Sequence, residues 1–383
     1  MRFFGSSMKI AHIADVHLGY QAYNRVTSQG INRRQADVFK SFREAMSKIA
    51  DISPDILIVA GDLFHVVRPS NLIIRQTYLE FLRFRENCSA KIVIIGGNHD
   101  SPRSADTGCI LDLFDTIPDV HVVQSDSRVL RFPDLDTSVF CLPHRALGSL
   151  SETKVEPDGS SSYNILTVHG TVEGVGADFY DAGRPISHSQ ISLSEWDYVA
   201  LGHYHVHTKI AENAYYSGAT EFTSTNIWEE VGHPKGFIEA ELGESLSVKF
   251  HEVATRDIVS LRSVDAKGLT AADIDTIIAE RLAGIPGGYS EKVVRLVVEN
   301  LDKAVIPDID YRAIRRYRIE ALHFDLVLRP ARRSSQFESL SDEHTARSLE
   351  DEWRAFASVY QIPPGLDRER FVSIGLEYMK ESD

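Results

Sequence analysis

The chain has 383 residues and a formal net charge of −14, from 41 Lys and Arg against 55 Asp and Glu. This length predicts two or three domains, and 43% hydrophobic with 25% charged residues excludes wholesale disorder. No apolar run approaches the roughly 20 residues of a membrane-spanning helix, and the acidic balance argues against a protein that coats nucleic acid by itself.

Residues up to about 255 alternate between strand and helix patterns. Continuous apolar runs such as ILIVA at 56–60 and KIVII at 91–95 are typical of strands that are covered on both faces. Helices are predicted over 35–50 and 71–86, and the second follows Pro69-Ser70, a helix start signal. The predicted strands span 9–14, 56–60, 91–96, 120–123, 139–142, 165–168, 198–201, 236–242 and 248–253.

A second α/β pattern begins after about residue 255. Its predicted elements are strands over 258–264, 293–298 and 322–328, and helices over 271–283 and 311–318. This unit is large enough to fold as a lobe of its own. The polar residues 330–343 are a candidate linker, and amphipathic helices are predicted over 344–360 and 367–380. The expected domains are therefore 1–255, 256–330 and 331–383.

Five short polar motifs each follow a predicted strand. They are Asp15-Val16-His17, Gly61-Asp62, Gly97-Asn98-His99-Asp100, His169-Gly170 and Gly202-His203-Tyr204-His205. Ligands of α/β sheets gather beyond the carboxyl ends of strands, so these ends would bring two carboxylates, one amide and five imidazoles into one pocket. The glycines fit this arrangement because they let the backbone turn sharply and expose the next side chain.

The ligand types indicate what the pocket holds. Neutral imidazoles, carboxylates and an amide oxygen suit borderline divalent metals such as Mn, Fe or Zn. The set is too large for one tetrahedral site, whereas two metals that share a carboxylate use it naturally. Such a pair clamps an in-line displacement at phosphorus and lowers the pKa of a bound water, which gives hydroxide near neutral pH. The residues therefore predict phosphoester hydrolysis.

The ordered series DxH, GD, GNHD, H and GHxH resembles the signature of the calcineurin-like metallophosphoesterases. The segments HIADVHLG, VAGDLFHVVRPS, IGGNHDSPRS, YVALGHYHV and YYSGATEF are more similar still to the SbcD-type DNA repair nucleases. The resemblance is strong over about residues 8–253 and extends to the rest only in layout. It implies an α/β fold (α+β by some schemes): a four-layer αββα sandwich of two mixed sheets, with a small α/β capping domain and a helical C-terminal tail.

The resemblance also implies a set of metal ligands. One metal would be held by Asp15, His17, Asp62 and His205, and the other by Asp62, Asn98, His169 and His203. Asp62 would bridge the two ions. Mn²⁺ is the expected metal, with Fe or Zn as alternatives.

Two further histidines resemble catalytic residues of the family. His99 matches the histidine that stabilises the transition state or protonates the leaving oxygen, and His65 matches a second histidine near the scissile phosphate. In phosphoprotein phosphatases the corresponding loop reads GDxxDRG, and its second Asp orients the catalytic histidine. Here GDLFHVVRP places His65 at that position, so that dyad is absent, which disfavours phosphoprotein phosphatase activity.

Structural roles are the alternative for each of these residues. Asp15 and Asp62 could cap helices, and His65 could simply pack beside Phe64. Asp100 is expected to support the site or cap a helix rather than to bind a metal. His207 continues the alternation of the GHxH motif but lies beyond it, so a ligand role is disfavoured. Structural roles are expected for His12, His121, His144, His188, His233, His251, His323 and His344.

Some arginines are candidate contacts to DNA phosphates. Arg33, Arg34 and Arg68 lie beside the motif loops, although a solvated helix face explains them about equally well. Residues 311–333 hold seven arginines against two acids, a local net charge of +5 in the expected capping domain. Salt bridges to the acidic bulk of the chain are the alternative.

The expected tail helices carry an apolar stripe. Its members are Leu349, Trp353, Phe356, Tyr360, Phe371, Ile374, Leu376 and Tyr378. This stripe could pack on its own domain or dock onto a partner. SbcD-type subunits use a C-terminal helical segment to bind the coiled-coil ATPase SbcC, so the resemblance implies docking.

These observations converge on one hypothesis. We expect a Mn²⁺-dependent DNA exonuclease and endonuclease, the nuclease component of an SbcC–SbcD-type double-strand-break repair complex, acting on DNA ends or hairpins as a homodimer. Three widely spaced cysteines and no signal-peptide pattern in residues 1–7 favour a cytoplasmic, nucleoid-associated location without membrane binding. The alternatives are a small-nucleotide or general phosphodiesterase, and a DNA-end tether with vestigial nuclease activity.

Overall fold

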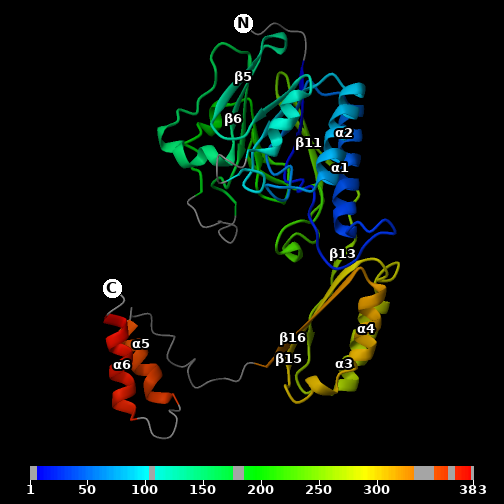
Figure 1. Ribbon diagram of the computed structural model, residues 1–383, viewed down its shortest axis with the longest axis vertical. Coiled ribbons are helices and arrows are strands. Elements are labelled where there is room, and N and C mark those ends of the chain that lie inside the picture. The colour runs from blue at the N-terminus through cyan, green and yellow to red at the C-terminus, as the bar shows by residue number, and fades with distance from the viewer. Residues whose placement is uncertain (1–6, 103–107, 176–184, 332–348, 361–366, 381–383) are drawn as a thin grey trace.

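The computed structural model describes residues 7–102, 108–175, 185–331, 349–360 and 367–380 (Figure 1). Nearly all of the predicted linker and the first residues of the predicted helix 344–360 lie outside these ranges. Arg332 and Arg333 of the basic segment also lie outside them. Within the described part of the chain, no helix has both the length and the apolar character needed to cross a membrane.

The first of two six-stranded sheets is mixed and has the order β12-β11-β1-β2-β3-β4. Strands β1 to β4 are parallel, whereas β11 runs antiparallel to β1 and β12 antiparallel to β11. The strands are β1 Met8–Ile13, β2 Ile56–Val59, β3 Lys91–Ile95, β4 Val120–Val123, β11 Gly236–Leu242 and β12 Leu246–Glu252. All six were predicted, because each is a continuous or alternating apolar run.

The second sheet has the order β5-β6-β7-β8-β10-β9, with β6, β7, β8 and β10 parallel and an antiparallel strand at each edge. Its strands are β5 Arg128–Phe132, β6 Thr137–Leu142, β7 Tyr163–His169, β8 Tyr198–Gly202, β9 Thr208–Ala211 and β10 Ala214–Tyr216. Strands β5, β9 and β10 were not predicted. The edge strands β5 and β9 are largely exposed or half-buried, and β10 has only three residues, so none has a clear apolar pattern.

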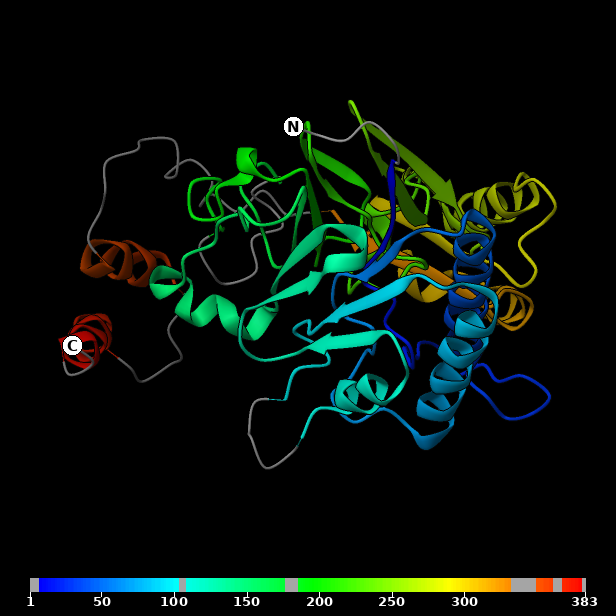
Figure 2. The same ribbon diagram turned by 90° about the horizontal axis from the view of Figure 1, so that it is seen from above.

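The two sheets pack face to face, and each has a covered outer face (Figures 1 and 2). Helices α1 Arg33–Ile52 and α2 Asn71–Asn87 cover the first sheet through a core that includes Phe42, Phe81 and Phe114. Both helices begin at a side-chain cap, Asn32 for α1 and Ser70 for α2. The second sheet is covered mainly by 3-10 segments, such as η4 His144–Glu152 and η6 Leu193–Glu195, and by loops. The expected sandwich of two mixed sheets is thus confirmed, with 3-10 turns in place of long helices over the outer face of the second sheet.

The third sheet is small and parallel. It consists of β13 Ile258–Ser260, β14 Val264–Asp265, β15 Val293–Leu301 and β16 His323–Pro330. Helices α3 Ala271–Ala283 and α4 Tyr311–Glu320 pack on one face (Figure 1). The predicted strand 258–264 is two strands, because β13 and β14 pair with opposite ends of β15.

Polar and aromatic contacts join the third sheet to the sandwich. Arg256 pairs with Asp37 of α1 and donates to the Glu291 carbonyl at 3.1 Å. Arg25 donates to the carbonyl oxygens of Arg318 and Ile319 at the end of α4. The ring of Tyr23 stacks on that of His323 at 4.0 Å. The contacts of Arg25 and Tyr23 hold α4 and β16 against the loop that precedes α1.

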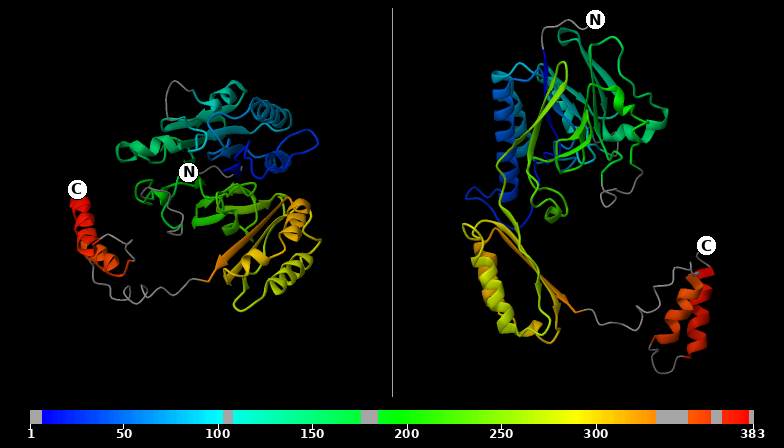
Figure 3. Two further views of the ribbon diagram at one scale, coloured as in Figure 1. Left: turned by 60° about the horizontal axis from the view of Figure 1, so that its bottom comes forward. Right: turned by 180° about the vertical axis from the view of Figure 1, so that it is seen from behind.

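The C-terminal helices α5 Leu349–Val359 and α6 Arg368–Lys380 pack on each other, away from the other elements (Figures 1 and 3). Trp353 of α5 lies against Gly375 of α6, where a Cβ would overlap the indole. The indole Nε1 donates to the Val372 carbonyl at 3.0 Å. Phe356 and Ile374 remain exposed, at 41% and 40%. The side chains of Leu349 and Tyr378, which belong to the predicted stripe, lie outside the described set.

Candidate metal centre

The five polar motifs meet at one edge of the sandwich. Three of them follow β1, β2 and β3 of the first sheet, and two lie at the ends of β7 and β8 of the second. The pocket between them has a volume of about 440 Å³. Its lining includes His17, Asp62, Asn98, His99, His203 and His205. Both sheets therefore contribute to one site.

One cluster in this pocket contains Asp15, His17 and His205. The Nε2 atoms of His17 and His205 lie 3.0 Å apart, so both rings aim a nitrogen at the same place. Asp15 and His17 are fully buried, and the Asp15 carboxylate accepts hydrogen bonds from the His203 backbone N–H at 2.9 and 3.0 Å. Three of the four ligands that the resemblance implied for the first metal therefore lie close together.

A second cluster surrounds the Asn98 side-chain oxygen. Nε2 of His169 and Nδ1 of His203 each lie 3.0 Å from Asn98 Oδ1. Asp62 lies between the two clusters, because its Oδ2 is 3.4 Å from His169 Nε2 and 3.6 Å from His17 Nε2. A divalent cation fits this chemistry, since imidazole, carboxylate and amide ligand groups, all buried or half-buried, converge with no Lys or Arg among them.

The backbone at these residues is strained. Positive φ angles, rare outside glycine, occur at Asp15 (52°), His17 (52°), Asp62 (50°) and His203 (102°). Each such residue costs on the order of 1–3 kcal/mol and persists only where the surrounding structure enforces it. The concentration of strain in the motif loops indicates that they are shaped for the position of their side chains rather than for stability.

Two glycines allow side chains of other motif loops to approach the backbone closely, in addition to allowing the chain to turn. A Cβ on Gly61, whose φ is +92°, would overlap Nδ1 of the His169 ring. A Cβ on Gly97 would overlap Oδ1 of Asp62. The glycines therefore allow loops from different strands to pack directly on the central side chains.

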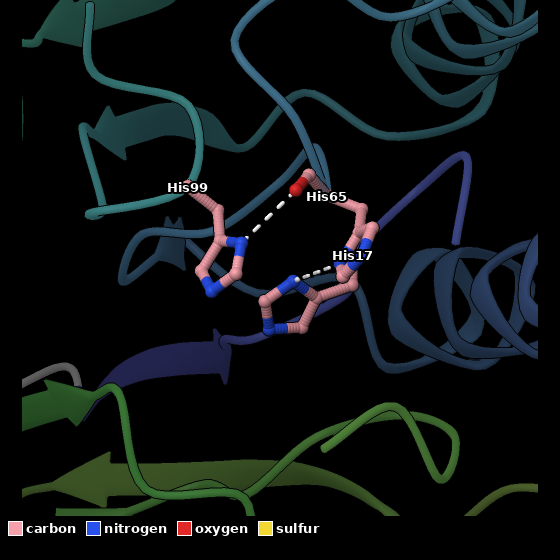
Figure 4. A group of neighbouring side chains, drawn as sticks. All are labelled: His17, His65 and His99. Carbon is pink, nitrogen blue, oxygen red and sulfur yellow. Dashed lines mark hydrogen bonds between the residues drawn. The ribbon is translucent and has the colours of Figure 1, made fainter. Parts of the chain in front are cut away.

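His99 and His65 lie together and both line the pocket (Figure 4). His99 Nδ1 is 3.0 Å from the backbone carbonyl oxygen of His65, and the two rings stack at 5.2 Å. A backbone carbonyl thus occupies the orienting role that an Asp side chain has in the GDxxDRG loop. The His65 Nδ1 faces His17 Nδ1 at 3.3 Å, so this ring supports His17 as well as facing the pocket.

The electrostatics of the centre follow from burial and close charges. Burial opposes charge on Asp62, but the neighbouring His169 and His17 outweigh it and hold the pKa of Asp62 below its usual range. Burial would also lower the pKa of His169, but the Asp62 and Asp15 carboxylates raise it to about 9. The pKa of His203 falls to about 3, mainly through burial and then through the nearby His169. The three groups are therefore electrostatically interdependent.

Asp100 supports the site without being part of either cluster. Its carboxylate accepts from the Gly97 N–H at 2.7 Å and from the Leu63 N–H at 2.8 Å, which ties the second and third motif loops together. Burial, together with the Asp62 charge, raises the pKa of Asp100 to about 7. The supporting role anticipated for Asp100 agrees with these contacts.

The structure also shows which other expected residues lie away from the site. Arg34 is only 1% exposed and donates to Glu221 Oε1 and to the Phe222 carbonyl. The expectation that Arg34 contacts DNA is therefore corrected, because its guanidinium is already engaged inside the protein. Arg33 pairs with Glu291, whereas Arg68 is exposed. His207 packs on Phe250 and bonds the Tyr216 carbonyl, away from both clusters.

Three nearby residues were not anticipated. Glu230 and Lys235 are buried beside His205, and the His144 ring stacks 6.3 Å from that of His203. Glu230 and Lys235 lie in a loop without any motif, and His144 follows a strand that ends in none of the five motifs. Only the fold brings them to the centre.

Comparison with known proteins agrees with this geometry. The sequence model of the calcineurin-like phosphoesterase family matches residues 8–223. The DNA double-strand break repair protein Mre11 of Methanocaldococcus jannaschii is 26% identical over 279 residues, covering 69% of this chain and 72% of its own. The SbcD component of the SbcCD nuclease of Staphylococcus epidermidis is 25% identical over 308 residues, covering 72% of this chain and 75% of its own.

A solved structure, that of Pseudomonas putida nuclease MPE, aligns with 42% of this chain and 62% of its own. Its sequence identity is 20% and its TM-score is 0.21, so the family assignment rests on the sequence matches. The family match spans more than half of the chain and contains all five motifs, and the structure has the corresponding two-sheet sandwich with His and Asp clusters at its edge. The chain therefore belongs to the calcineurin-like phosphoesterase family, as the motifs predicted, and is a metallophosphoesterase-type enzyme.

Proposed function

We propose that the centre binds two divalent metal ions and hydrolyses phosphodiesters. Asp15, His17, Asp62 and His205 would hold one ion, and Asp62, Asn98, His169 and His203 the other. The observation that carries this proposal is the position of Asp62 Oδ2 between His17 and His169. When bound, such metals polarise the phosphoryl group and make water a better nucleophile near neutral pH. Mn²⁺ is the proposed physiological ion, with Fe or Zn as alternatives.

The protein's own contribution is orientation and proton handling. The His65 carbonyl accepts from Nδ1–H of His99, so Nε2 of that ring faces the pocket, and a ring protonated on both nitrogens would give its Nε2 proton to the leaving oxygen. The His99 backbone N–H donates to Asp62 Oδ1 at 2.8 Å, so the same loop fixes the central carboxylate. His65 would contact the substrate phosphate from the stacked ring beside His99.

We propose DNA as the substrate and double-strand-break repair as the context. The names of the Mre11 and SbcCD relatives support this, as do the exposed arginines of α4 and the exposed Arg68. In this proposal residues 1–255 form the nuclease domain and 256–330 a capping domain that contacts DNA. The protein would act as an exonuclease and endonuclease on DNA ends and hairpins, in the cytoplasm at the nucleoid.

The remaining parts of the proposal concern partners. Residues 331–383 would bind an SbcC-type coiled-coil ATPase through α5 and α6, whose exposed side chains include Phe356, Tyr360 and Ile374. Deleting 344–383 should abolish copurification with that ATPase and spare Mn²⁺ binding; unchanged association would remove this part of the proposal. Homodimerisation would use exposed apolar residues of α2, which include Leu72 and Leu79.

One assay discriminates the substrate classes. The purified protein with Mn²⁺ is incubated in parallel with linear duplex DNA, a DNA hairpin, single strands, cyclic dinucleotides and a p-nitrophenyl phosphodiester. We expect cleavage of duplex ends and hairpins. Cleavage of only the small substrates would instead assign a small-nucleotide phosphodiesterase, and DNA binding without any Mn²⁺-dependent hydrolysis would assign a tether.

A further inference from the structure

A buried ion pair lies directly behind one of the proposed metal ligands. Glu230 is 3% exposed and follows η7 Ile227–Glu229, and Lys235 is 2% exposed and precedes β11. The Lys235 ammonium pairs with Glu230 Oε2 and also donates to the backbone carbonyl of His205 at 2.7 Å. One lysine therefore connects the carboxylate to the main chain of the GHxH motif.

The other carboxylate oxygen faces the His205 ring. Glu230 Oε1 lies 3.5 Å from His205 Nδ1, and both atoms are buried without a hydrogen-bond partner among the described residues. The opposite ring nitrogen, Nε2, faces His17 Nε2 at 3.0 Å. The ring thus stands between the carboxylate on one side and the first metal cluster on the other.

This arrangement destabilises the folded protein unless the unpaired polar atoms gain a partner. A buried carboxylate needs compensation, and Lys235 supplies it to one oxygen only. Leaving the second oxygen and a ring N–H unpaired would cost about 1–3 kcal/mol for each group. A rotation of the His205 ring by a small angle would let the two orphan atoms satisfy each other. Metal-binding histidines commonly donate their second ring N–H to a carboxylate in this way, which fixes the tautomer and makes the ligand more basic.

We infer that Glu230, held by Lys235, is a positioning residue that orients His205 with Nδ1–H toward the carboxylate and the Nε2 lone pair toward the first cluster. This inference rests on the proposed metal binding. In the second cluster a backbone group orients the histidine ring instead, because His169 Nδ1 lies 2.8 Å from the Ala60 backbone carbonyl. His205 therefore depends on a side chain that mutation can remove, whereas His169 depends on the main chain.

The test measures Mn²⁺ binding to the full-length protein by isothermal titration calorimetry. Glu230→Gln should weaken one of two Mn²⁺ sites by roughly 10–100-fold, the range for loss of such an outer partner, and leave the other site near the parental affinity. The stabilisation of the protein by Mn²⁺ in thermal melts should fall in parallel. The matched control is Glu239→Gln, which breaks another Glu–His pair, 2.7 Å from His251 on the β11–β12 hairpin, and should leave both sites unchanged.

A double-mutant cycle separates positioning from general loop stability. If Glu230 acts through the ring, Glu230→Gln in a His205→Ala background should cause no further loss of Mn²⁺ affinity. An equal further loss in that background would overturn the inference. Should Glu230→Gln not fold, Glu230→Asp keeps the charge for Lys235 but withdraws it from the ring, and parental Mn²⁺ affinity in that variant would overturn the inference equally.

The outcomes also separate this inference from the proposed function. A parent protein that binds no Mn²⁺, or an Asp62→Asn variant that binds like the parent, would contradict the two-metal proposal itself. A parent that binds two Mn²⁺ and cleaves DNA, beside a Glu230→Gln variant with the same two affinities, would leave the function standing and remove only the role of Glu230.

Discussion

The edge of the sandwich where the five motifs meet and helix α4 both concentrate functional residue types, and they are built in opposite ways. At the edge, Asp15, His17 and Asp62 are buried and their backbone is strained. On α4, the arginines at 312, 315 and 316 are exposed on an ordinary capped helix. Burial fixes groups precisely enough for chemistry, whereas exposed charges act through a screened and distributed field. We therefore expect single substitutions to be decisive at the edge and graded on α4.

The largest effect is expected at the carboxylate between the clusters. Asp62→Asn keeps the shape of the side chain and a residue that tolerates positive φ, but removes the charge that both proposed metal positions would share. Phosphodiester hydrolysis should fall by about 10³-fold or more, because metal assistance contributes several kcal/mol. Mn²⁺-dependent cleavage of a p-nitrophenyl phosphodiester measures this.

The matched control is Asp119→Asn. Asp119 also has a positive φ, of 61°, but pairs with Arg85 and Lys91 far from the motifs. It should keep parental activity. Activity equal to the parent in Asp62→Asn, with both proteins folded by circular dichroism, would contradict the assignment of the centre.

His99 should come next. The His99 ring packs against His17 at 4.7 Å but is not one of the proposed metal ligands. His99→Gln removes the proton donor and leaves those ligands in place, so kcat should fall by about 10²–10⁴-fold while Mn²⁺ affinity stays the same. Steady-state kinetics and calorimetry on the same preparation provide both numbers. His207→Gln is the control, since His207 is also half-buried but bonds the Tyr216 carbonyl. Loss of a metal in His99→Gln would make this residue a ligand instead.

The buried histidine His12 also predicts that the stability of the protein depends on pH. His12, between the two sheets, lies 3.0 Å from the Tyr198 hydroxyl and 3.2 Å from the Leu201 carbonyl, and burial lowers its pKa from 6.5 to about 3. The unfolded chain therefore binds a proton that the folded chain refuses between these values. His12 therefore does not reduce the free energy of unfolding above pH 6.5. As the pH falls from 6.5 toward 3, His12 lowers the free energy of unfolding by about 1.4 kcal/mol per pH unit.

Urea unfolding of the metal-free protein at a series of pH values between 4 and 7 tests this prediction. His12→Gln should lose part of the parental dependence of unfolding free energy on pH, whatever its absolute stability. Identical slopes for the two proteins would show that His12 is protonated in the folded state or that its burial is incomplete.

The smallest effects are expected on α4. Replacing Arg312, Arg315 and Arg316 by Gln should weaken DNA binding at low salt and reduce the slope of log affinity against log salt by about 0.9 for each phosphate that is no longer neutralised. Cleavage of the small p-nitrophenyl substrate should not change. Fluorescence anisotropy at several salt concentrations measures the slope. Arg329→Gln is a control, because Arg329 is paired with Glu299 at 3.1 Å; an equal loss there would indicate a general charge effect.

Sequence and structure determined different parts of this picture. The identities of Asp62, Asn98 and His169 as site residues were readable from the chain, because each follows a buried strand and strand ends are local features. The two-sheet sandwich followed from the family resemblance of the motifs, and the apolar runs supplied most of its strands. The weak edge strands and the split of 258–264 into β13 and β14 were not readable, because they depend on which strand lies beside them.

Only the tertiary structure decided how the side chains meet. Arg34 looked available for DNA, but the fold buries it against Glu221. The His65 main chain, rather than an Asp, orients His99, and no residue pattern records a backbone carbonyl. Glu230 reaches His205 from a loop with no motif. The sequence alone thus determined which chemistry this protein carries, because ligand types and strand ends are local. The fold determined which groups hold the ligands in place, because those contacts join residues far apart in the chain.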